Sequence, residues 1–448
     1  MQKKETQKYW NPILETLPPK KIKELQFKKF KRIVEWAYAN SKLYRRLYDD
    51  AGFKPEDLKR WEDIYKVPIV QKEDYRKAQA KEPWPYGDTL CVPLDDVTEY
   101  HQTSGTTGQP VYQPDTWQDW EWWSEMWAYI LWAQGFRKSD RVFIPFGYNV
   151  TMASWAGHYA SEKVGCEVVP GGILNTEERL LKIKELKASA IMASPSYVIK
   201  MAETCKKQLK MDPSELNIQK ILCAGEPGAS VPSTKKRMEE EWNTKVYDNV
   251  MATEVGGWAY ECTSQPGGLH VNEAFFLVEL VDIDTGDPIE ELHIPGKIII
   301  TAFDRYAQPC IRFDTKDISM WGKPCECGRT YRILKGGVHG RVDHITKIKG
   351  VSFNPLSVEE VVRNTPELAD EYFLEVKEEG AAEVLILKVE KRPDVSIDTE
   401  TLKHNLARQL RLKTNLNFRI EFLEYGTLPR PEVKIQRFID LRTNKGKR

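Results

Sequence analysis

Between residues 86 and 260, short apolar runs alternate with amphipathic segments, and this alternation restricts the fold more than any other feature of the chain. Each apolar run has the length of a buried strand, and the amphipathic segments have the length of helices. The predicted strands lie at 141–145, 166–170, 190–194 and 220–224, with helices such as 176–186 and 232–242 between them. Strands that alternate with helices usually form a parallel sheet covered by those helices. The sequence therefore predicts an α/β fold with a mostly parallel sheet.

The segments on either side of this region follow other patterns. Residues 1 to about 85 are charged and carry apolar positions at three- and four-residue spacing, for example between Lys20 and Tyr48, which indicates helices. Residues 275–303 contain two apolar runs, which we expect to form antiparallel strands.

The character of the sequence changes again near Gly340. Beyond this point the sequence predicts two strands, a helix and a third strand, at 372–376, 383–389, 401–412 and 418–423. A chain of 448 residues is too long for one core. We therefore expect a large domain over 1–339 and a small α+β domain over 340–448, joined at the polar segment Gly340-Arg341-Val342-Asp343.

The charge balance argues against two classes of partner. The chain has 66 basic and 66 acidic side chains, so general attraction to nucleic acid or to an anionic membrane is not indicated. Its apolar runs fall short of the roughly 18 residues that a bilayer span needs. The start, Met1–Thr6, leads into charged sequence without the apolar core of a signal peptide. We expect a cytoplasmic protein without nucleic-acid or membrane partners.

A loop rich in hydroxyl groups and glycine lies at Thr103–Pro110. Glycines let the backbone approach an anion closely, and Ser and Thr hydroxyls donate hydrogen bonds to phosphate oxygens. The loop lacks the Gly-Lys-Ser/Thr ending of a Walker loop, which disfavours a kinase or P-loop ATPase. Taken alone, such a loop is equally well explained as a solvated turn.

Four further segments carry residues suited to nucleotide chemistry. They are Ala224–Gly228, Ala252–Glu254, Arg312–Asp317 and Leu428–Arg437. The first two follow predicted strands, and ligands of open α/β sheets bind at the carboxyl ends of strands. Asp317 could accept hydrogen bonds from the two hydroxyls of a ribose, and the last segment contains Lys434.

Each of these residues also has a purely structural explanation. Glu254 could cap a helix, Asp317 could end a strand in a turn, and a single lysine such as Lys434 is usually a solvated surface residue. The order and spacing of the whole set favour the functional explanation.

With these motifs in this order, the sequence resembles the adenylate-forming acyl-CoA ligases, and within them the phenylacetate-CoA ligase branch. The resemblance extends from about Tyr9 to Asp440. It implies an α/β fold with a large N-terminal domain of mostly parallel sheets and a small mobile α+β C-terminal domain. It also implies an enzyme that converts a carboxylic acid and ATP to acyl-AMP and pyrophosphate, and then transfers the acyl group to coenzyme A.

The resemblance implies a nucleotide site. The matching residues are Ser104, Gly105, Thr106, Thr107, Gly108, Gly225, Glu226, Pro227, Thr253, Asp317 and Arg341. Residues 104–108 would hold the β- and γ-phosphates of ATP, and residues 225–227 would line the adenine. Asp317 would bind the ribose, and Arg341 would make a second nucleotide contact. Glu254 would ligate Mg²⁺, a hard cation suited to oxygen ligands.

The resemblance assigns three functions to the small domain. Lys434 would reach the substrate carboxylate and the α-phosphate, because both reactants are anionic and their charges must be neutralised. Asp343 would be the hinge of the domain, and Gly350 would lie at the pantetheine channel of coenzyme A. We infer a domain rotation between the two steps, because the lysine must leave space for pantetheine.

The sequence departs from the family pattern at three places. Val250-Met251 replace a Tyr-Gly pair, which leaves the aromatic stacking on adenine unassigned. Val433 replaces the glycine that usually precedes the catalytic lysine, and this change would stiffen the loop. Lys316 stands before Asp317 in place of a small or basic residue, a change that looks tolerable.

Three of the eight cysteines form a pattern with one histidine. Cys262, His270, Cys325 and Cys327 suit a closed structural zinc site, in which three thiolates and one imidazole surround the metal. The alternative is a set of buried free thiols beside a hydrogen-bonded histidine, because Cys-x-Cys is tighter than the usual Cys-x-x-Cys. We favour zinc, which some members of the resembling branch carry. Such a metal would take no part in acyl transfer.

The substrate is indicated by two aromatic segments. Trp120, Trp123 and Trp127 share one face of a predicted helix, which we expect to be core or the interface of a homodimer. The family's acyl pocket corresponds to residues 146–155, from which we select Tyr148 and Trp155 as substrate contacts. The bulky residues here suggest a pocket altered from the phenylacetate type. We expect an aryl or arylacetic acid, with a small branched or hydroxylated acid as the alternative.

Two other functions remain open from the sequence. The enzyme could pass the acyl group to an amine or to the thiol of a carrier protein. The chain could also be a nucleotide-binding scaffold without activity.

Overall fold

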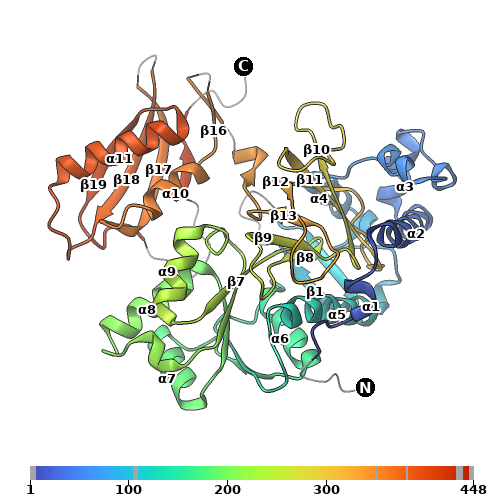
Figure 1. The fold of residues 1–448 in the computed structure, drawn as a ribbon. Helices are drawn as coiled ribbons and strands as arrows, with labels where there is room; N and C mark the ends of the chain where they lie inside the picture. Colours follow the sequence, from blue (N-terminus) through green and yellow to red (C-terminus); the bar gives the residue numbers. More distant parts are fainter. Residues whose placement is uncertain are drawn as a thin grey trace.

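A twelve-stranded mixed sheet forms the centre of the larger part of the protein (Figure 1). The computed structural model describes residues 7–103, 109–344, 346–349, 351–379, 382–429 and 437–442. One half of the sheet is parallel and has the strand order β4-β3-β5-β6-β7. These strands are β3 (Arg141–Ile144), β4 (Glu167–Pro170), β5 (Ala190–Ala193), β6 (Lys220–Cys223) and β7 (Lys245–Ala252). The α/β fold and the mostly parallel arrangement of this region are confirmed.

Four helices alternate with the parallel strands. They are α6 (Ala153–Val164), α7 (Thr176–Leu186), α8 (Pro195–Lys207) and α9 (Pro232–Trp242). Local sequence fixes their ends: Asn175 and Glu178 form a capping box at the start of α7, and Gly165 ends α6 with a φ of +98°. All four residues of β5 are buried, because helices cover both faces of a parallel sheet.

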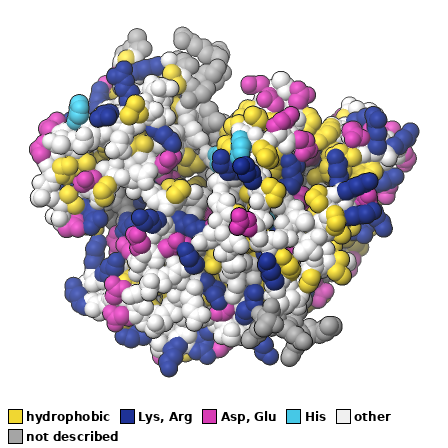
Figure 2. Space-filling model, viewed as in Figure 1, with side chains coloured by type: hydrophobic (Ala, Val, Ile, Leu, Met, Phe, Trp, Pro, Cys, Tyr) yellow, Lys and Arg dark blue, Asp and Glu magenta, His cyan; other side chains and the backbone are white. Residues whose placement is uncertain are grey.

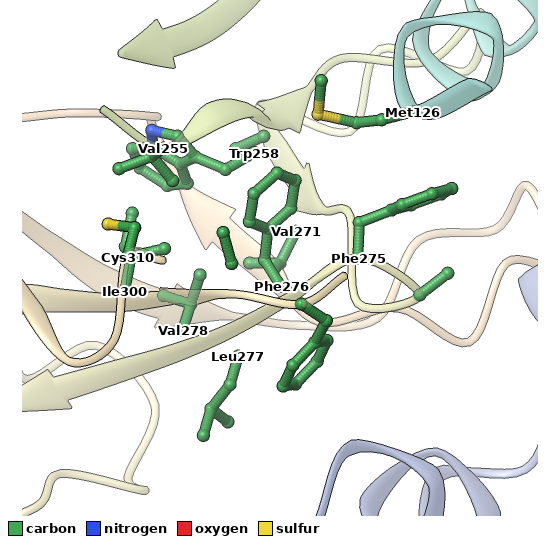
Figure 3. Close-up of a cluster of buried hydrophobic side chains, with 14 of the residues drawn as sticks. Met126, Val255, Trp258, Val271, Phe275, Phe276, Leu277, Val278, Ile300 and Cys310 are labelled. Carbon is green, nitrogen blue, oxygen red and sulfur yellow. The ribbon is translucent and has the colours of Figure 1, made fainter. Parts of the chain in front are cut away.

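The other half of the sheet is antiparallel. It consists of β8 (Gly256–Tyr260), β9 (Gly268–Val271), β10 (Phe276–Val281), β11 (Pro295–Ala302), β12 (Phe313–Gly322), β13 (Ile333–Lys335) and β14 (Gly340–Arg341). The antiparallel pairing of β10 with β11 confirms the prediction for residues 275–303. Side chains from these strands and from the neighbouring helix α5 (Trp117–Ala133) gather in a common core, shown in Figure 3 around Phe276, Trp258 and Met126.

The N-terminal part of the chain packs against this half of the sheet. It contains α1 (Pro12–Glu15), α2 (Pro19–Asn40), α3 (Lys42–Asp50), α4 (Lys72–Gln79), the hairpin of β1 (Val97–Gln102) and β2 (Tyr112–Thr116), and α5 (Trp117–Ala133). On α5, the side chains of Trp120, Trp123 and Trp127 are at most 2% exposed and belong to the core. Of the two alternatives for this helix face, the structure selects the core. The homodimer stays a prediction.

The C-terminal part forms a second, smaller lobe with its own core (Figure 1). Its elements are β15 (Thr346–Ile348), β16 (Val351–Phe353), α10 (Leu356–Arg363), β17 (Leu368–Glu379), β18 (Ala382–Lys391), α11 (Thr399–Thr414), β19 (Phe418–Leu423) and β20 (Phe438–Asp440). The sheet has the order β19-β18-β17-β20, and the predicted strands and helix all lie within these elements. The domain boundary near Gly340 stays a prediction.

Positive and negative side chains are mixed over the face of the molecule shown in Figure 2, consistent with the equal numbers of acidic and basic residues. Within the described ranges, none of the helices has both the length and the apolar character required to cross a bilayer.

Candidate active site

The carboxyl ends of two neighbouring strands bring the first predicted segments together. Strands β6 and β7 are parallel and hydrogen-bonded, with Cys223 opposite Asp248. The segment after β6 contains Gly225, Glu226 and Pro227, and the segment after β7 contains Thr253 and Glu254. Both segments therefore leave the sheet at the same edge, where open α/β sheets bind ligands.

Glu226 fixes the conformation of the first segment. The backbone N–H and the hydroxyl of Ser196 both donate hydrogen bonds to Glu226 Oε1, with an N···O distance of 2.8 Å for the first. Because Ser196 lies in the first turn of α8, this carboxylate also satisfies a free N–H at the helix start. Gly225 has a φ of +94° and open space where a Cβ would stand. The segment thus leaves room for a ligand beside its backbone.

Glu254 is the centre of a buried polar network. Its side chain is 7% exposed and forms an ion pair of 2.8 Å with Lys72, the first residue of α4. Arg305 donates to the carbonyl oxygens of Thr253 and Glu254 at 3.0 and 2.9 Å. Arg305 is itself paired with Asp115, and both side chains are fully buried. The network holds the backbone at Glu254 in place and keeps its carboxylate beside one cation.

Asp317, Arg341 and Asp343 form a second charged group. Asp317 on β12 lies opposite Arg341 on β14 in the strand register. Arg341 Nη1 lies 3.5 Å from Asp317 Oδ1, while its Nε and Nη2 donate to the two oxygens of Asp343 at 2.9 and 2.8 Å. The structure thus brings together the predicted ribose, nucleotide and hinge residues.

The two charged groups lie within electrostatic reach of each other. Burial lowers the pKa of Arg341, but the hydrogen bond to Asp343 and the charges of Asp317 and Glu254 outweigh burial and raise this pKa above its usual value. The pKa of Arg437 in the small lobe is also raised. Burial lowers this pKa, but the charges of Glu371 and other acidic residues, Glu226 among them, outweigh burial.

Several predicted residues lie outside the described ranges. They are Ser104, Gly105, Thr106, Thr107, Gly108, Gly350 and Lys434. The two ends of the hydroxyl-rich loop are described, and they lie together: Thr103 N–H donates to the Val111 carbonyl, and Val111 N–H donates to Thr103 Oγ1, both at 3.0 Å. The loop therefore starts and ends at one point of the β1–β2 hairpin.

The predicted acyl-pocket segment is a half-buried aromatic cluster. The rings of Tyr148 and Trp155 meet edge to face with centroids 5.0 Å apart. The Tyr148 hydroxyl lies 3.0 Å from His158 Nδ1. A hydrogen bond from Gln102 N–H to the Val150 carbonyl, at 2.9 Å, joins this segment to the strand that leads into the hydroxyl-rich loop. The predicted acyl and phosphate sites are thereby neighbours.

Two residues of this region were missed by sequence reasoning. Lys72 lies far from Glu254 in the sequence, and nothing in its local pattern distinguishes it from other lysines. His101 is 1% exposed and stacks on Trp120, with centroids 5.1 Å apart and an angle of 16° between the rings. Burial, assisted by the charge of Arg305, lowers the pKa of His101 to about 4.

The four predicted zinc ligands converge on one point of the large lobe. The ligand atoms of Cys262, His270, Cys325 and Cys327 all lie within 4.8 Å of one another. Cys262 Sγ is 3.8 Å from Cys325 Sγ, and Cys327 Sγ is 3.4 Å from His270 Nε2. Tetrahedral zinc with Zn–S bonds of about 2.3 Å separates its sulfur ligands by about 3.8 Å. The spacing of these side chains therefore fits the metal.

Comparison with known proteins supports a single family. Residues 350–442 match the family described as the AMP-binding enzyme C-terminal domain. The chain is 31% identical to a phenylacetate-coenzyme A ligase of Thermus thermophilus, over 97% of this chain and 99% of the relative. It is 29% identical to the phenylacetate-coenzyme A ligase of Escherichia coli, over 96% and 97% of the two chains.

Solved structures of one ligase in two states are similar to this protein in fold and differ from each other in how well they match it. A 2-hydroxyisobutyryl-CoA ligase in the postadenylation state, in complex with 2-HIB-AMP, has a TM-score of 0.91 at 27% identity, covering 97% of this chain and 93% of the other. The same ligase in the thioesterification state has a TM-score of 0.74 at 27% identity, covering 98% and 95%. Since the sequence similarity is the same, the lower score reflects a different arrangement of the parts.

The similarity to the Thermus enzyme covers almost the full length of both chains. It agrees with the two-lobed fold and with the position of Glu226 and Glu254 after the carboxyl ends of β6 and β7. The chain belongs to the adenylate-forming acyl-CoA ligases, in the branch of the phenylacetate-CoA ligases.

Proposed function

We propose that this protein activates an aryl or arylacetic acid with ATP and transfers the acyl group to coenzyme A. The observation that carries this proposal is the similarity to phenylacetate-coenzyme A ligases over almost the whole length of both chains. We further propose that residues 1–339 form the domain that binds ATP and the acid, and that 340–448 form the mobile domain with the catalytic lysine.

We assign the residues that contact each part of the nucleotide as the resemblance implies. Residues 104–108 hold the β- and γ-phosphates, and Gly225, Glu226 and Pro227 line the adenine, with Thr253 as a further contact. Asp317 binds the ribose and Arg341 contacts the nucleotide. The shared sheet edge and the Asp317–Arg341 pairing support this assignment, because they place the proposed contacts side by side.

Glu254 is the proposed ligand of Mg²⁺. A bound Mg²⁺ supplies positive charge to the phosphates, and its preference for carboxylate oxygen fits this side chain. In the structure the Lys72 ammonium is paired with the Glu254 carboxylate at 2.8 Å. Lys72 therefore keeps the charge of this buried carboxylate balanced and can turn to a phosphate oxygen when the nucleotide enters.

Lys434 is the proposed catalytic lysine. It follows β19 and precedes Arg437, whose charge interacts with that of Glu226 in the proposed adenine site. The lysine would lower the repulsion between the acid carboxylate and the α-phosphate as their bond forms. Asp343 is the proposed hinge and Gly350 the proposed contact to coenzyme A.

We propose a structural zinc ion at Cys262, His270, Cys325 and Cys327. The ion would join the turn after β8, strand β9 and the turn after β12. Three neighbouring thiols in a largely buried cluster are stabilised as thiolates by a metal, and the closed ligand set leaves no position for substrate.

A small hydroxylated acid is the second candidate substrate. The structural similarity to 2-hydroxyisobutyryl-CoA ligase favours it. Tyr148 and Trp155, the proposed acyl contacts, present both a hydroxyl and an apolar ring surface, which suit either class of acid.

The test is a panel of aryl, arylacetic and small hydroxylated acids, scored by pyrophosphate release with and without coenzyme A. We expect acid-dependent pyrophosphate release and an acyl-CoA product. Pyrophosphate exchange without AMP release on addition of coenzyme A would instead support an amine or carrier-protein thiol as acceptor. The absence of pyrophosphate with every acid would contradict the proposal.

A further inference from the structure

Glu254 lies in a tight turn between β7 and β8. The two strands pair up to Ala252 and Gly256, and the Val255 N–H donates to the Ala252 carbonyl at 3.1 Å. Three residues, Thr253–Val255, therefore make the turn. Carbonyl groups in such a turn have no partner in the sheet, and a buried backbone carbonyl needs a hydrogen-bond donor. Glu254 and Val255 are both buried, so donors must come from another part of the chain.

Arg305, in the connection between β11 and β12, supplies these donors. Its Nη1 donates to the carbonyl oxygens of both Thr253 and Glu254. The Thr253 carbonyl belongs to the peptide group before the Glu254 Cα, and the Glu254 carbonyl belongs to the peptide group after it. Planar peptide groups leave only φ and ψ free at a residue, so two fixed groups restrict both angles. One guanidinium nitrogen thus constrains the direction in which the Glu254 side chain leaves the backbone.

The Arg305 guanidinium is itself held by two other elements. Nε and Nη2 donate to the two oxygens of Asp115 on β2, both at 3.0 Å, and this pair is fully buried. The two backbone N–H groups that follow Arg305 donate to Asp119 on α5 at 2.6 and 3.3 Å. The position of Glu254 therefore depends on β2 and α5 through Arg305. A lysine has a single nitrogen and cannot occupy all these positions, whereas the planar fork of arginine does.

We propose that Arg305 is a positioning residue for Mg²⁺ that acts through Glu254. This inference rests on the proposed function, in which the Glu254 carboxylate binds the metal. Arg305 is fully buried and its charge is balanced by Asp115, so it acts by fixing the carboxylate and not by contact with the nucleotide. Groups that orient a metal ligand from behind typically contribute about 10- to 100-fold to metal affinity. We therefore expect Arg305 to strengthen the effect of Mg²⁺ on ATP binding.

The test measures how much Mg²⁺ tightens the binding of ATP. Calorimetric titration gives the Kd of ATP in Mg²⁺-free buffer and at saturating Mg²⁺, and the ratio of the two values is the Mg²⁺ effect. Arg305→Lys should lower this ratio by about 10-fold, with no more than about a twofold change in the Kd without Mg²⁺. Arg179→Lys is the matched control, because this buried arginine donates to the carbonyls of Gly171 and Gly172 at 3.0 and 2.9 Å. It should leave the ratio unchanged.

A double variant separates this role from a general loss of stability. Glu254→Gln should also lower the ratio, and adding Arg305→Lys should cause no further loss, because both changes act on the same contact to the metal. An unchanged ratio in Arg305→Lys would overturn the proposal, as would an equal loss in Arg179→Lys or a full additional loss in the double variant. If Arg305→Lys does not fold, Asp115→Asn, which weakens the hold on Arg305 and preserves side-chain volume, decides the question by the same ratio.

The same measurements distinguish this inference from the proposed function. If the ratio falls in Arg305→Lys but the wild-type protein activates no acid, the function fails and the inference holds. If the ratio is unchanged while the wild type releases pyrophosphate with an acid, the inference fails and the function stands. If Glu254→Gln leaves the ratio unchanged, Glu254 is not the metal ligand, and the inference falls with that assignment.

Discussion

Lys207, at the end of α8 in the large lobe, donates a hydrogen bond of 2.7 Å to the hydroxyl of Tyr425 in the small lobe. A cavity of 360 Å³ lies between α9 and the start of β17, lined from both lobes. The overall arrangement agrees with the postadenylation state of 2-hydroxyisobutyryl-CoA ligase better than with its thioesterification state. The Lys207–Tyr425 contact therefore belongs to an arrangement of the lobes that is similar to the postadenylation state of that ligase.

Tyr425→Phe should shift the balance of the two half-reactions. The change removes one exposed hydrogen bond that favours the observed arrangement, a loss of about 0.5–1.5 kcal/mol, or roughly a two- to tenfold shift between arrangements. We expect slower acyl-AMP formation and equal or faster transfer to coenzyme A, measured in separate half-reactions. Tyr38→Phe is the matched control, because Tyr38 donates to Asp49 on the exposed surface of the large lobe. A parallel change of both rates would contradict this role.

Asp317→Asn should weaken recognition of the ribose. The carboxylate accepts hydrogen bonds from hydroxyls more strongly than an amide does, so we expect KM for ATP to rise by about 10- to 100-fold. The specific readout is discrimination against 2′-deoxy- and 3′-deoxy-ATP, which the wild type should show and the variant should lose. Asp343→Asn removes the other partner of Arg341 and should leave this discrimination intact. If both variants discriminate as the wild type does, Asp317 has another role.

Removal of the proposed zinc should lower stability without a direct effect on catalysis. We expect one zinc ion per chain by elemental analysis. Cys325→Ser should lose it and lower the melting temperature by several degrees, because the metal joins three separate segments of the large lobe. Cys91→Ala is the control, since this buried thiol lies outside the cluster. A protein that is prepared with zinc in excess and contains none would refute the assignment.

His101 should make stability depend on pH in the acid range. Its pKa is about 4 in the folded protein, below the usual 6.5, so the unfolded chain binds a proton first as pH falls. The free energy of unfolding should therefore decrease as pH falls from 6.5 to 4, and His101→Phe should reduce this decrease. The comparison is chemical denaturation at several pH values. Tyr159→Phe, which changes another ring packed on Trp120, should leave the slope unchanged.

The repeated pattern of the central region was sufficient to predict the parallel strands and their helices. Apolar runs such as 190–193 and caps such as Asn175 act locally, so a single sequence reveals them. The cysteine cluster was also predicted, because Cys-x-Cys marks one half of it. The spacing of tryptophans on α5 indicated an apolar face but not the elements that pack against it. The structure shows that α6 and the strands β1, β2 and β8 pack against this helix.

The basic residues around the site could not be predicted. Lys72 reaches Glu254, Arg76 reaches Gln109 and His101 reaches Trp120 through the packing of α4, β1 and α5. Such contacts depend on how distant segments meet in space, and the local sequence around each residue resembles many solvated helices and strands. The residues with family motifs were recognised, whereas the residues that support them were not.

The formation of an acyl adenylate is tested most directly with an acid from the substrate panel that carries ¹⁸O at both oxygens of its carboxylate. If the carboxylate attacks the α-phosphorus, AMP released in the presence of coenzyme A contains one ¹⁸O atom per turnover, detected by mass spectrometry. Label in inorganic phosphate together with ADP, or unlabelled AMP beside labelled thioester, would contradict the account.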